Sequence, residues 1–209
     1  MSINRLRQKL NEVKNKNISL PPECSSLQFA SVISDKDVSF FERKYNFKLP
    51  YDIRHFITEV GNGGFGPGFG LKPLNDDSFY HPFTPAENRN AFDLSVQFPY
   101  SDGWNYEDLR IAMENSNENK DELLEYYFSI NRTPGCFQIC DWGSGGVALL
   151  VVNGNEYGKI WIDYRDTFGG IRPVLLKDDS VDHMSFCQWY EAWLDEILME
   201  IPLNQRQFR

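Results

Sequence analysis

The spacing of hydrophobic residues predicts helices at both ends of the chain. Near the start, residues 3–13 carry a hydrophobic residue at every third or fourth position, which is typical of an amphipathic helix. Residues 35–46 repeat this spacing, with Asp35 as the expected N-cap. Near the other end, Ser185 and Gln188 have the spacing of a capping box, and hydrophobic residues follow at helical spacing. We therefore expect helices before and after the central part of the chain.

The strongest helical pattern begins at Leu49-Pro50. Proline is common at the first position of a helix, and the hydrophobic residues that follow share one face. These residues are Ile53, Phe56, Ile57 and Val60. The segment Gly61-Asn62-Gly63-Gly64 then predicts that the helix ends through at least one left-handed residue, because glycine and asparagine tolerate a positive φ.

Between the helices, hydrophobic residues form short runs separated by glycine-rich turns. The runs predict strands of an antiparallel meander at residues 136–141, 147–152, 158–164 and 171–175, with a further short strand at 71–74. Helices on both sides of a group of strands predict an α+β fold, in which N-terminal helices and a C-terminal amphipathic helix bracket an antiparallel or mixed sheet. We expect residues 1–209 to form a single domain, with a basic N-terminal helix in residues 1–20.

The hydrophobic face of each expected element predicts the core. A large side chain on that face is expected to be buried against the neighbouring elements. The residues expected in the core are Phe56, Ile57, Val60, Leu150, Val152, Trp161 and Trp193.

Composition and charge narrow the class of partner. The chain is 41% hydrophobic and 15% aromatic, a composition that excludes intrinsic disorder. Its net charge is −9, and because residues 1–20 carry +4, the remaining 189 residues carry −13. A protein that binds nucleic acid or an anionic membrane needs Lys and Arg to neutralise phosphates. We therefore expect neither partner, and a basic protein fits better.

The cysteines and the hydrophobic runs indicate the cellular compartment in which the protein is expected. Cys24, Cys136, Cys140 and Cys187 lack the spacing of a disulfide framework or of a metal site, so we expect free thiols. The longest aliphatic run, residues 147–152, is too short to span a bilayer, and the N-terminus lacks the apolar core of a signal peptide. These features predict a cytoplasmic protein.

Two stretches concentrate the acidic residues. Residues 101–127 contain eight acids and two bases, and residues 178–200 contain seven acids and no base. Both are consistent with ordinary solvated faces. The first also contains Trp104 in an irregular segment, where an aromatic side chain beside carboxylates suits an interface with a basic partner. The candidate partner-binding residues are Asp102, Trp104, Glu107 and Asp108.

Motifs for cofactors, metals and nucleophilic catalysis are weak. Residues 61–66 and 143–148 match glycine patterns of dinucleotide-binding loops, but the first follows a helix and the second joins two strands, so we expect turns. His55, His81 and His183 are dispersed without metal-ligand spacing and are expected to be ordinary surface or loop histidines. The sequence has no G-x-S-x-G motif. We therefore expect no cofactor, no metal and no catalytic residue.

Three blocks of the sequence resemble the SUKH superfamily, which contains fungal cell-wall assembly regulators of the Smi/Knr type and many bacterial immunity proteins. The first block runs from Phe47 to Leu74, the second from Val151 to Asp163, and the third comprises Ser185-Phe186 with Trp189 and Trp193-Leu194. The residues that carry the structural motif are Leu49, Pro50, Phe56, Gly61, Asn62, Gly63, Gly64 and Trp161. The resemblance covers most of a core at residues 35–199, and residues 76–134 form a longer, more divergent middle region than a minimal member has.

The resemblance implies a SUKH-like fold and a role in binding, not catalysis. Bacterial members are generally taken to neutralise secreted toxins, many of them nucleases, whereas fungal members act as scaffolds. A small acidic protein can block the substrate site of a basic toxin and gain association rate from its electrostatic field. We expect an immunity protein whose partner is a cognate, basic toxin domain. The alternatives are a scaffold or regulatory interaction protein, or a small-ligand-binding protein or enzyme that uses the cleft beside the glycine-rich loop.

Overall fold

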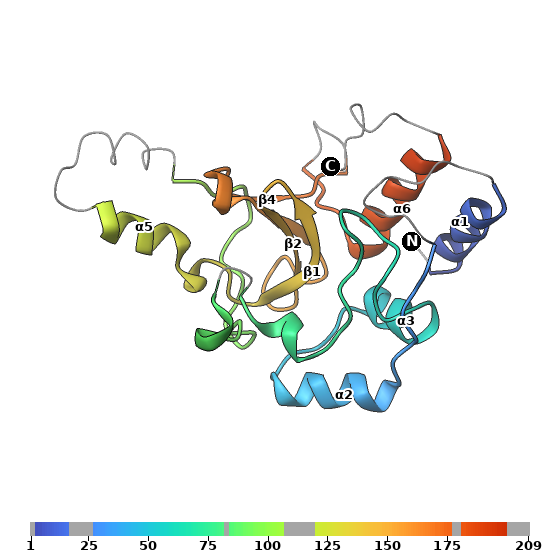
Figure 1. The fold of residues 1–209 in the computed structure, drawn as a ribbon, viewed down its shortest axis with the longest axis horizontal. Helices are drawn as coiled ribbons and strands as arrows, with labels where there is room; N and C mark the ends of the chain where they lie inside the picture. The colour runs from blue at the N-terminus through green and yellow to red at the C-terminus, as the bar shows by residue number, and fades with distance from the viewer. Residues whose placement is uncertain (1–2, 17–26, 82–83, 107–119, 177–180, 200–209) are drawn as a thin grey trace.

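An antiparallel sheet lies at the centre of the computed structural model (Figure 1). The structure describes residues 3–16, 27–81, 84–106, 120–176 and 181–199. The strands pair in chain order and are β1 (Cys136–Gly143), β2 (Gly146–Val151), β3 (Ile160–Asp163) and β4 (Ile171–Pro173). Because each strand runs antiparallel to the next, the predicted meander is confirmed.

Helices precede and follow the sheet. The α-helices are α1 (Ile3–Asn15), α2 (Asp35–Lys44), α3 (Tyr51–Glu59), α5 (Lys120–Phe128) and α6 (Phe186–Leu198). Short 3-10 helices are η2 (Asp76–Phe79), η3 (Ala86–Asn88), η4 (Ile130–Arg132) and η5 (Arg165–Thr167). The fold is therefore α+β in a single domain, with an antiparallel sheet between N-terminal helices and a C-terminal helix.

Two helix starts differ by one residue from the prediction. The N-cap of α2 is Ser34 and not Asp35, because the Ser34 Oγ accepts a hydrogen bond from the Asp37 backbone N at 3.2 Å. Pro50 is the N-cap of α3 and not its first helical residue, since its ψ of 143° is extended. The predicted capping box of Ser185 and Gln188 at the start of α6 is confirmed.

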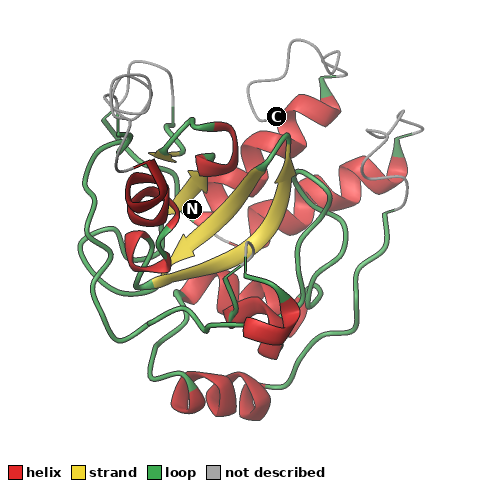
Figure 2. Cartoon of the chain, turned by 60° about the vertical axis from the view of Figure 1, so that its left-hand side comes forward, coloured by secondary structure: helices red, strands yellow, loops and turns green. Residues whose placement is uncertain are grey.

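The helix α6 packs against the sheet, and α1 and α3 pack against α6 (Figure 2). The ring of Trp189 in α6 lies 5.8 Å from that of Trp142 in β1. Phe56 of α3 lies 5.2 Å from Phe186 and 5.1 Å from Tyr190, both in α6. Aromatic contacts therefore join the first helices, the last helix and the sheet into one core.

The middle region also contributes to the core. Trp161 of β3 is fully buried, and its ring lies 4.9 Å from Phe98 and 6.3 Å from Tyr100. Phe92 and Leu94 from the same region are buried as well. Residues 92–100 of the middle region thus belong to the core.

Most of the predicted core residues are buried. Those confirmed are Phe56, Ile57, Leu150, Val152, Trp161 and Trp193. The prediction is wrong for Val60, which is half-buried at the edge of the core. Val60 is the C-cap of α3, with φ −111° and ψ −54°, so it lies outside the regular helix whose face was extrapolated to it.

Irregular segments pair with both outer strands of the sheet. Along β1, the backbone N of Phe69 donates to Asp141 O at 2.9 Å, and that of Lys72 donates to Ile139 O at 2.8 Å. The strand expected at 71–74 is present only as this short pairing. Along β4, Trp104 forms an antiparallel bridge with Ile171.

Candidate functional site

Trp104 lies against the edge of the sheet and is half-buried. Its backbone exchanges two hydrogen bonds with Ile171, with N–O distances of 2.8 and 2.7 Å. Its ring stacks between Tyr100, at 5.7 Å, and Tyr127, at 5.5 Å. The Arg132 guanidinium lies 5.9 Å from the same ring. Trp104 therefore has a role within the fold, and its part in an interface stays a prediction.

Of the other candidate interface residues, the structure describes only Asp102. Asp102 is exposed and lines a groove of about 540 Å³ next to Arg172 and Lys159. Glu107 and Asp108 lie outside the described residues. Of the candidate carboxylates beside Trp104, Asp102 is thus the one among the described residues.

A histidine and a carboxylate pair in the groove that Asp102 lines. His183 Nδ1 lies 2.5 Å from Glu156 Oε2, and the Trp161 indole N–H donates to the same oxygen at 3.3 Å. Lys159 Nζ donates to the His183 carbonyl oxygen at 2.7 Å. A histidine oriented by a carboxylate is one arrangement that general acid–base catalysis uses. This groove is therefore where an enzymatic alternative would have to be tested.

A second polar cluster is buried beneath the middle region. The Arg165 side chain is fully buried, and its Nη2 lies 2.7 Å from Asp163 Oδ2. Its Nη1 donates to the carbonyl oxygens of Tyr127 and Ser129, each at 2.9 Å. Because a buried charge is costly unless it is paired and hydrogen-bonded, this arginine ties the end of α5 to β3. The sequence signal is an arginine two residues after an aspartate, which is too common to identify such a pair.

His81 belongs to the same buried cluster. Its Nε2 lies 3.3 Å from Arg165 Nη2, and since a guanidinium can only donate, this ring nitrogen is the acceptor. Burial and the nearby Arg165 charge lower the pKa of His81 to about 4, although Asp163 opposes the shift. The expectation of an ordinary surface or loop histidine is therefore wrong for His81, which is 3% exposed. Its burial depends on residues 84 positions away, which local sequence does not show.

The glycine-rich segment after α3 forms a turn. Gly63 and Gly64 have the positive φ values predicted for this segment, 97° and 101°. The helix itself does not end through a left-handed residue, because its C-cap Val60 is right-handed and the next residue, Gly61, has no positive φ. The Asn62 Oδ1 accepts a hydrogen bond from Leu74 N at 2.8 Å. The turn therefore positions the 71–74 segment beside the sheet.

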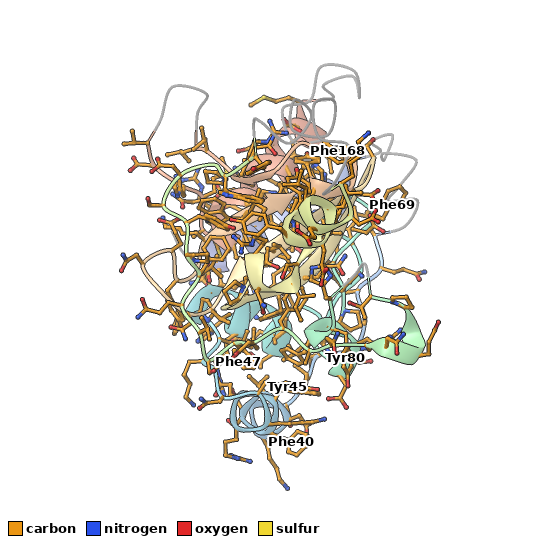
Figure 3. All side chains as sticks on the ribbon, turned by 90° about the vertical axis from the view of Figure 1, so that its left-hand side faces the viewer. Phe40, Tyr45, Phe47, Phe69, Tyr80 and Phe168 are labelled. Atoms are coloured by element: carbon orange, nitrogen blue, oxygen red, sulfur yellow. The ribbon has the colours of Figure 1, made fainter. Side chains whose placement is uncertain are left out.

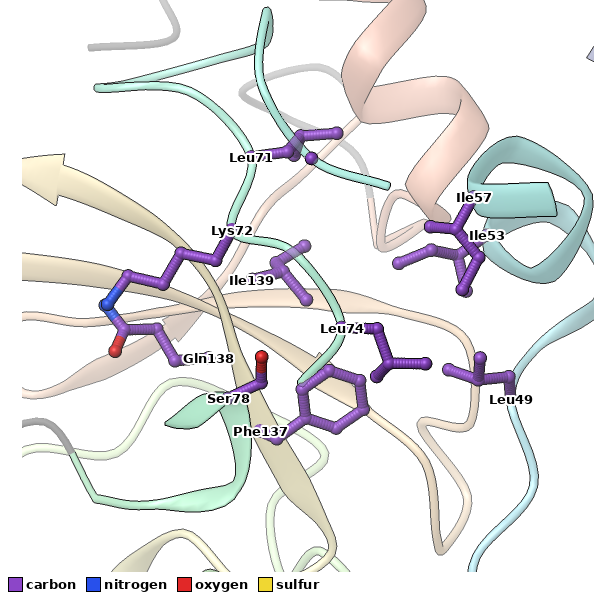
Figure 4. A pocket seen from close by; sticks show the side chains of 11 residues that line it. Leu49, Ile53, Ile57, Leu71, Lys72, Leu74, Ser78, Phe137, Gln138 and Ile139 are labelled. Carbon is purple, nitrogen blue, oxygen red and sulfur yellow. The ribbon is translucent and has the colours of Figure 1, made fainter. Parts of the chain in front are cut away.

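The space beside this turn is small (Figure 4). The cavity there has a volume of about 20 Å³, enough for about one water molecule. Its lining is mostly aliphatic and includes Leu49, Ile53 and Leu74. A small-molecule ligand does not fit this cavity, which removes the support for the small-ligand alternative at the glycine-rich loop.

The acidic C-terminal stretch is not a simple solvated face. Lys9 Nζ in α1 lies 2.8 Å from Glu191 Oε1 and 2.5 Å from Asp195 Oδ1, both in α6. Arg5 Nε lies 2.5 Å from Glu191 as well. The solvated-face interpretation is therefore wrong for these α6 carboxylates, because the basic N-terminal helix neutralises them. In the sequence, the only sign of these ion pairs is that residues 1–20 are basic and residues 178–200 are acidic.

The described cysteines are buried and not disulfide-bonded. Cys136, Cys140 and Cys187 are free thiols, and Cys24 lies outside the described residues. Burial raises the pKa of Cys187 to about 12 and that of Cys136 well above its usual range. Thiols with raised pKa values are poor nucleophiles at neutral pH.

The structure also bears on metal binding and on membrane insertion. Within the described ranges, no three His, Cys, Asp or Glu side chains come together as metal ligands. None of the helices described is both long and apolar enough to cross a bilayer. Comparisons with protein-family models, with curated proteins and with solved structures found no match to this chain.

Proposed function

We propose that this chain is a non-catalytic protein-binding domain that acts as an immunity protein and neutralises a basic toxin domain. The observation that carries the proposal is the net charge of −9 together with the exposed carboxylates that form no ion pair with another described residue. These residues are Glu12, Asp37, Glu87, Asp93, Asp102, Asp121, Glu122, Glu125, Asp141 and Asp166. They outnumber the exposed bases without such a pair, which are Lys14, Lys16, Lys36, Arg43, Lys72, Lys120 and Arg172. The basic residues of α1, in contrast, are partly used inside the fold against α6.

The charge distribution favours a cationic partner. A surface with unpaired carboxylates attracts a basic protein over several ångströms to tens of ångströms, depending on salt. A nuclease toxin has a basic substrate site because it must bind phosphates. An acidic protein that covers such a site would exclude the nucleic acid by like-charge repulsion and by steric contact.

The resemblance to the SUKH superfamily supports the same proposal. The motif residues Leu49, Pro50, Phe56 and Trp161 are buried together in the core, where they stabilise the fold and are not available for catalysis. Members of the superfamily act by binding other proteins. Buried free thiols fit a reducing compartment, and we accordingly place this function in the cytoplasm.

Co-expression tests this function. The proteins encoded beside this gene would each be expressed with and without the chain, and growth and complex formation would be measured. We expect one basic neighbour that arrests growth alone, is harmless with the chain, and forms a stoichiometric complex in size-exclusion chromatography with light scattering.

The same experiment distinguishes the alternatives. A complex that leaves the activity of the partner unchanged would favour a scaffold. For the enzymatic alternative, Glu156→Gln would abolish turnover of a candidate substrate, whereas an immunity protein with this substitution still protects. If no neighbour binds, or if the partner is acidic, the proposed function is wrong.

A further inference from the structure

The turn between β1 and β2 lies next to Phe69 and Asp166, and Phe168 follows two residues after Asp166. We define the hairpin face as Phe69, Asp141, Ser144, Asp166 and Phe168. Figure 3 labels Phe69 and Phe168 in the upper half of the view. Phe69 is 61% exposed and Phe168 is 50% exposed. Large aromatic side chains with this exposure are typical of interfaces when they lie close together.

The β1–β2 turn at the centre of this face has a defined backbone geometry. Gly143 pairs with Gly146, so Ser144 and Gly145 form a two-residue loop, and their φ values of 51° and 75° are typical of a type I′ turn. A Cβ atom on Gly143 would lie 2.9 Å from the Phe69 ring, and one on Gly145 would lie 2.6 Å from the Asp166 carboxylate. Phe69 and Asp166 therefore flank the same turn closely.

Phe168 has an unusual backbone conformation. Its φ of 57° and ψ of 23° are left-handed, a region that a bulky side chain rarely adopts. Glycine would suit this position better for the backbone alone. The ring makes contacts with Tyr127 at 5.8 Å and Phe128 at 5.9 Å, yet half of it remains in solvent. A strained residue with an exposed side chain is a reason to look for a function of that side chain.

Charge separates this face from other exposed aromatics. Phe40 has the Lys44 ammonium 6.0 Å from its ring, and Tyr51 stacks with His55 at 4.1 Å. In contrast, the backbone N of Phe69 donates to the Asp141 carbonyl oxygen, and Phe168 follows Asp166 by two residues. Asp141 and Asp166 form no ion pair with a described residue.

The groove on the other side of the turn has a balanced charge. It is lined by Asp77, Lys72 and Arg89 in addition to Asp141. Arg89 pairs with Asp77 and its guanidinium lies 5.6 Å from the Tyr80 ring, so this cation is already engaged. Lys72 in this groove and Asp141 and Asp166 at the hairpin thus remain without an ion pair to a described residue, so two carboxylates stand against one cation.

We propose that the hairpin face is the surface on which the basic partner docks. This inference rests on the proposed function and names the surface that performs it. Phe69 and Phe168 contact apolar parts of the partner, and Asp141 and Asp166 pair with its Lys or Arg side chains. Aromatic anchors surrounded by polar groups are the usual composition of an interface hot spot.

Binding kinetics test the aromatic part of the proposal. The probe is the basic partner found by co-expression, and the full chain is used throughout. Phe69→Ala and Phe168→Gly should each speed dissociation at least about 10-fold, because a buried aromatic anchor acts mainly on the dissociation rate. Phe40→Ala, which removes an equally exposed ring elsewhere, should change it less than about 2-fold.

Thermal melting separates binding from folding. Phe168→Gly relieves the left-handed strain, so its melting temperature should equal or exceed that of the wild type while its binding weakens. If melting falls and binding is unchanged, the ring serves only the fold and the inference is wrong. Asp166→Lys should slow association at low salt and have a smaller effect at physiological salt.

The outcomes also separate this inference from the proposed function. If the partner is inhibited as tightly by all three hairpin-face variants as by the wild type, the function stands and the hairpin face is wrong. If no basic partner binds the wild-type chain, both are wrong. Hydrogen-exchange protection of residues 141–146 on complex formation would support the surface directly, and protection confined to other segments would contradict it.

Discussion

Phe56 joins three parts of the core at a single side chain. It is fully buried between Phe29, Phe186 and Tyr190. Phe56→Ala should therefore lower the free energy of unfolding by about 3–5 kcal/mol, through lost burial and the cavity left behind. Urea unfolding would measure it, with Phe40→Ala as the matched control at about 0.5 kcal/mol or less. A small loss at Phe56 would mean that the surrounding helices close the cavity.

His81 makes stability depend on pH. Its folded pKa of about 4 lies below the ordinary value of 6.5, so between these values the unfolded chain binds a proton that the folded chain does not. This contribution to stability is complete above pH 6.5 and is lost as the pH falls toward 4, by about 3 kcal/mol in total.

The variant His81→Gln isolates this effect. Glutamine retains an acceptor for Arg165 but does not titrate. We expect the unfolding free energy of the variant to fall less steeply between pH 7 and pH 4 than that of the wild type, as measured in urea at a series of pH values. Equal slopes would show that other groups produce the acid sensitivity.

Local sequence could not reveal the environments of Trp104 and His81. Both lie in irregular segments without a hydrophobic period, and such segments are usually exposed. Their burial comes from Ile171, Tyr127 and Arg165, which are distant in sequence. Side-chain environments in loops therefore required the tertiary structure, whereas Phe56 and Trp161 were predictable because each lies in a regular element.

Among the elements, the turn after α3 depends on glycine at Gly64. Its φ is +101°, and an added Cβ would lie 2.9 Å from Phe29 Cα. Gly64→Ala should lower stability by about 2–4 kcal/mol through backbone strain and overpacking. Gly103→Ala is the control, because the nearest atom to its Cβ would be 3.6 Å away. Similar denaturation midpoints for the two variants would contradict this account.

The contact between α1 and α6 depends on ion pairs at a partly buried site. Lys9→Met leaves the buried Glu191 carboxylate with Arg5 alone, so we expect a loss of about 2 kcal/mol in unfolding free energy. The double variant Lys9→Met with Glu191→Met should be more stable than the single one, because a hydrophobic pair can replace a buried ion pair. Additive losses in a double-mutant cycle would show that the two groups do not interact.

Helices and strands with a clear hydrophobic period could be predicted from the sequence, but which of them pack against each other could not. The helices α1, α3 and α6 and the four strands follow directly from periods of about 3.6 and from short apolar runs between turns. The pairing of α1 with α6 brings together residues 186 positions apart, and periodicity contains no information about such a contact. The start of α2 differs by one residue because Ser34, next to Asp35, also has a side chain that can accept from the first turn, and the start of α3 differs because Pro50 itself is extended.

For the whole molecule, net charge predicts the kinetics of association. The Debye length shortens from about 30 Å at 0.01 M to about 8 Å at 0.15 M ionic strength. Over this range the association rate constant with a basic partner should fall at least about 10-fold, and the dissociation rate constant should change less than about 3-fold. Surface plasmon resonance at several salt concentrations would measure both. An association rate that is independent of salt would mean that the carboxylates do not steer the encounter.

The paired edges of the sheet have a consequence for self-association. An open strand edge offers unpaired N–H and C=O groups to a second copy and is a common start of edge-to-edge aggregation. In this protein Phe69 and Lys72 bind the backbone of β1, and Trp104 binds that of β4. Each outer strand thus ends in a short, irregular neighbour that a further strand cannot extend as a regular ladder. A second copy that adds to β1 or β4 edge to edge would therefore first have to displace these segments.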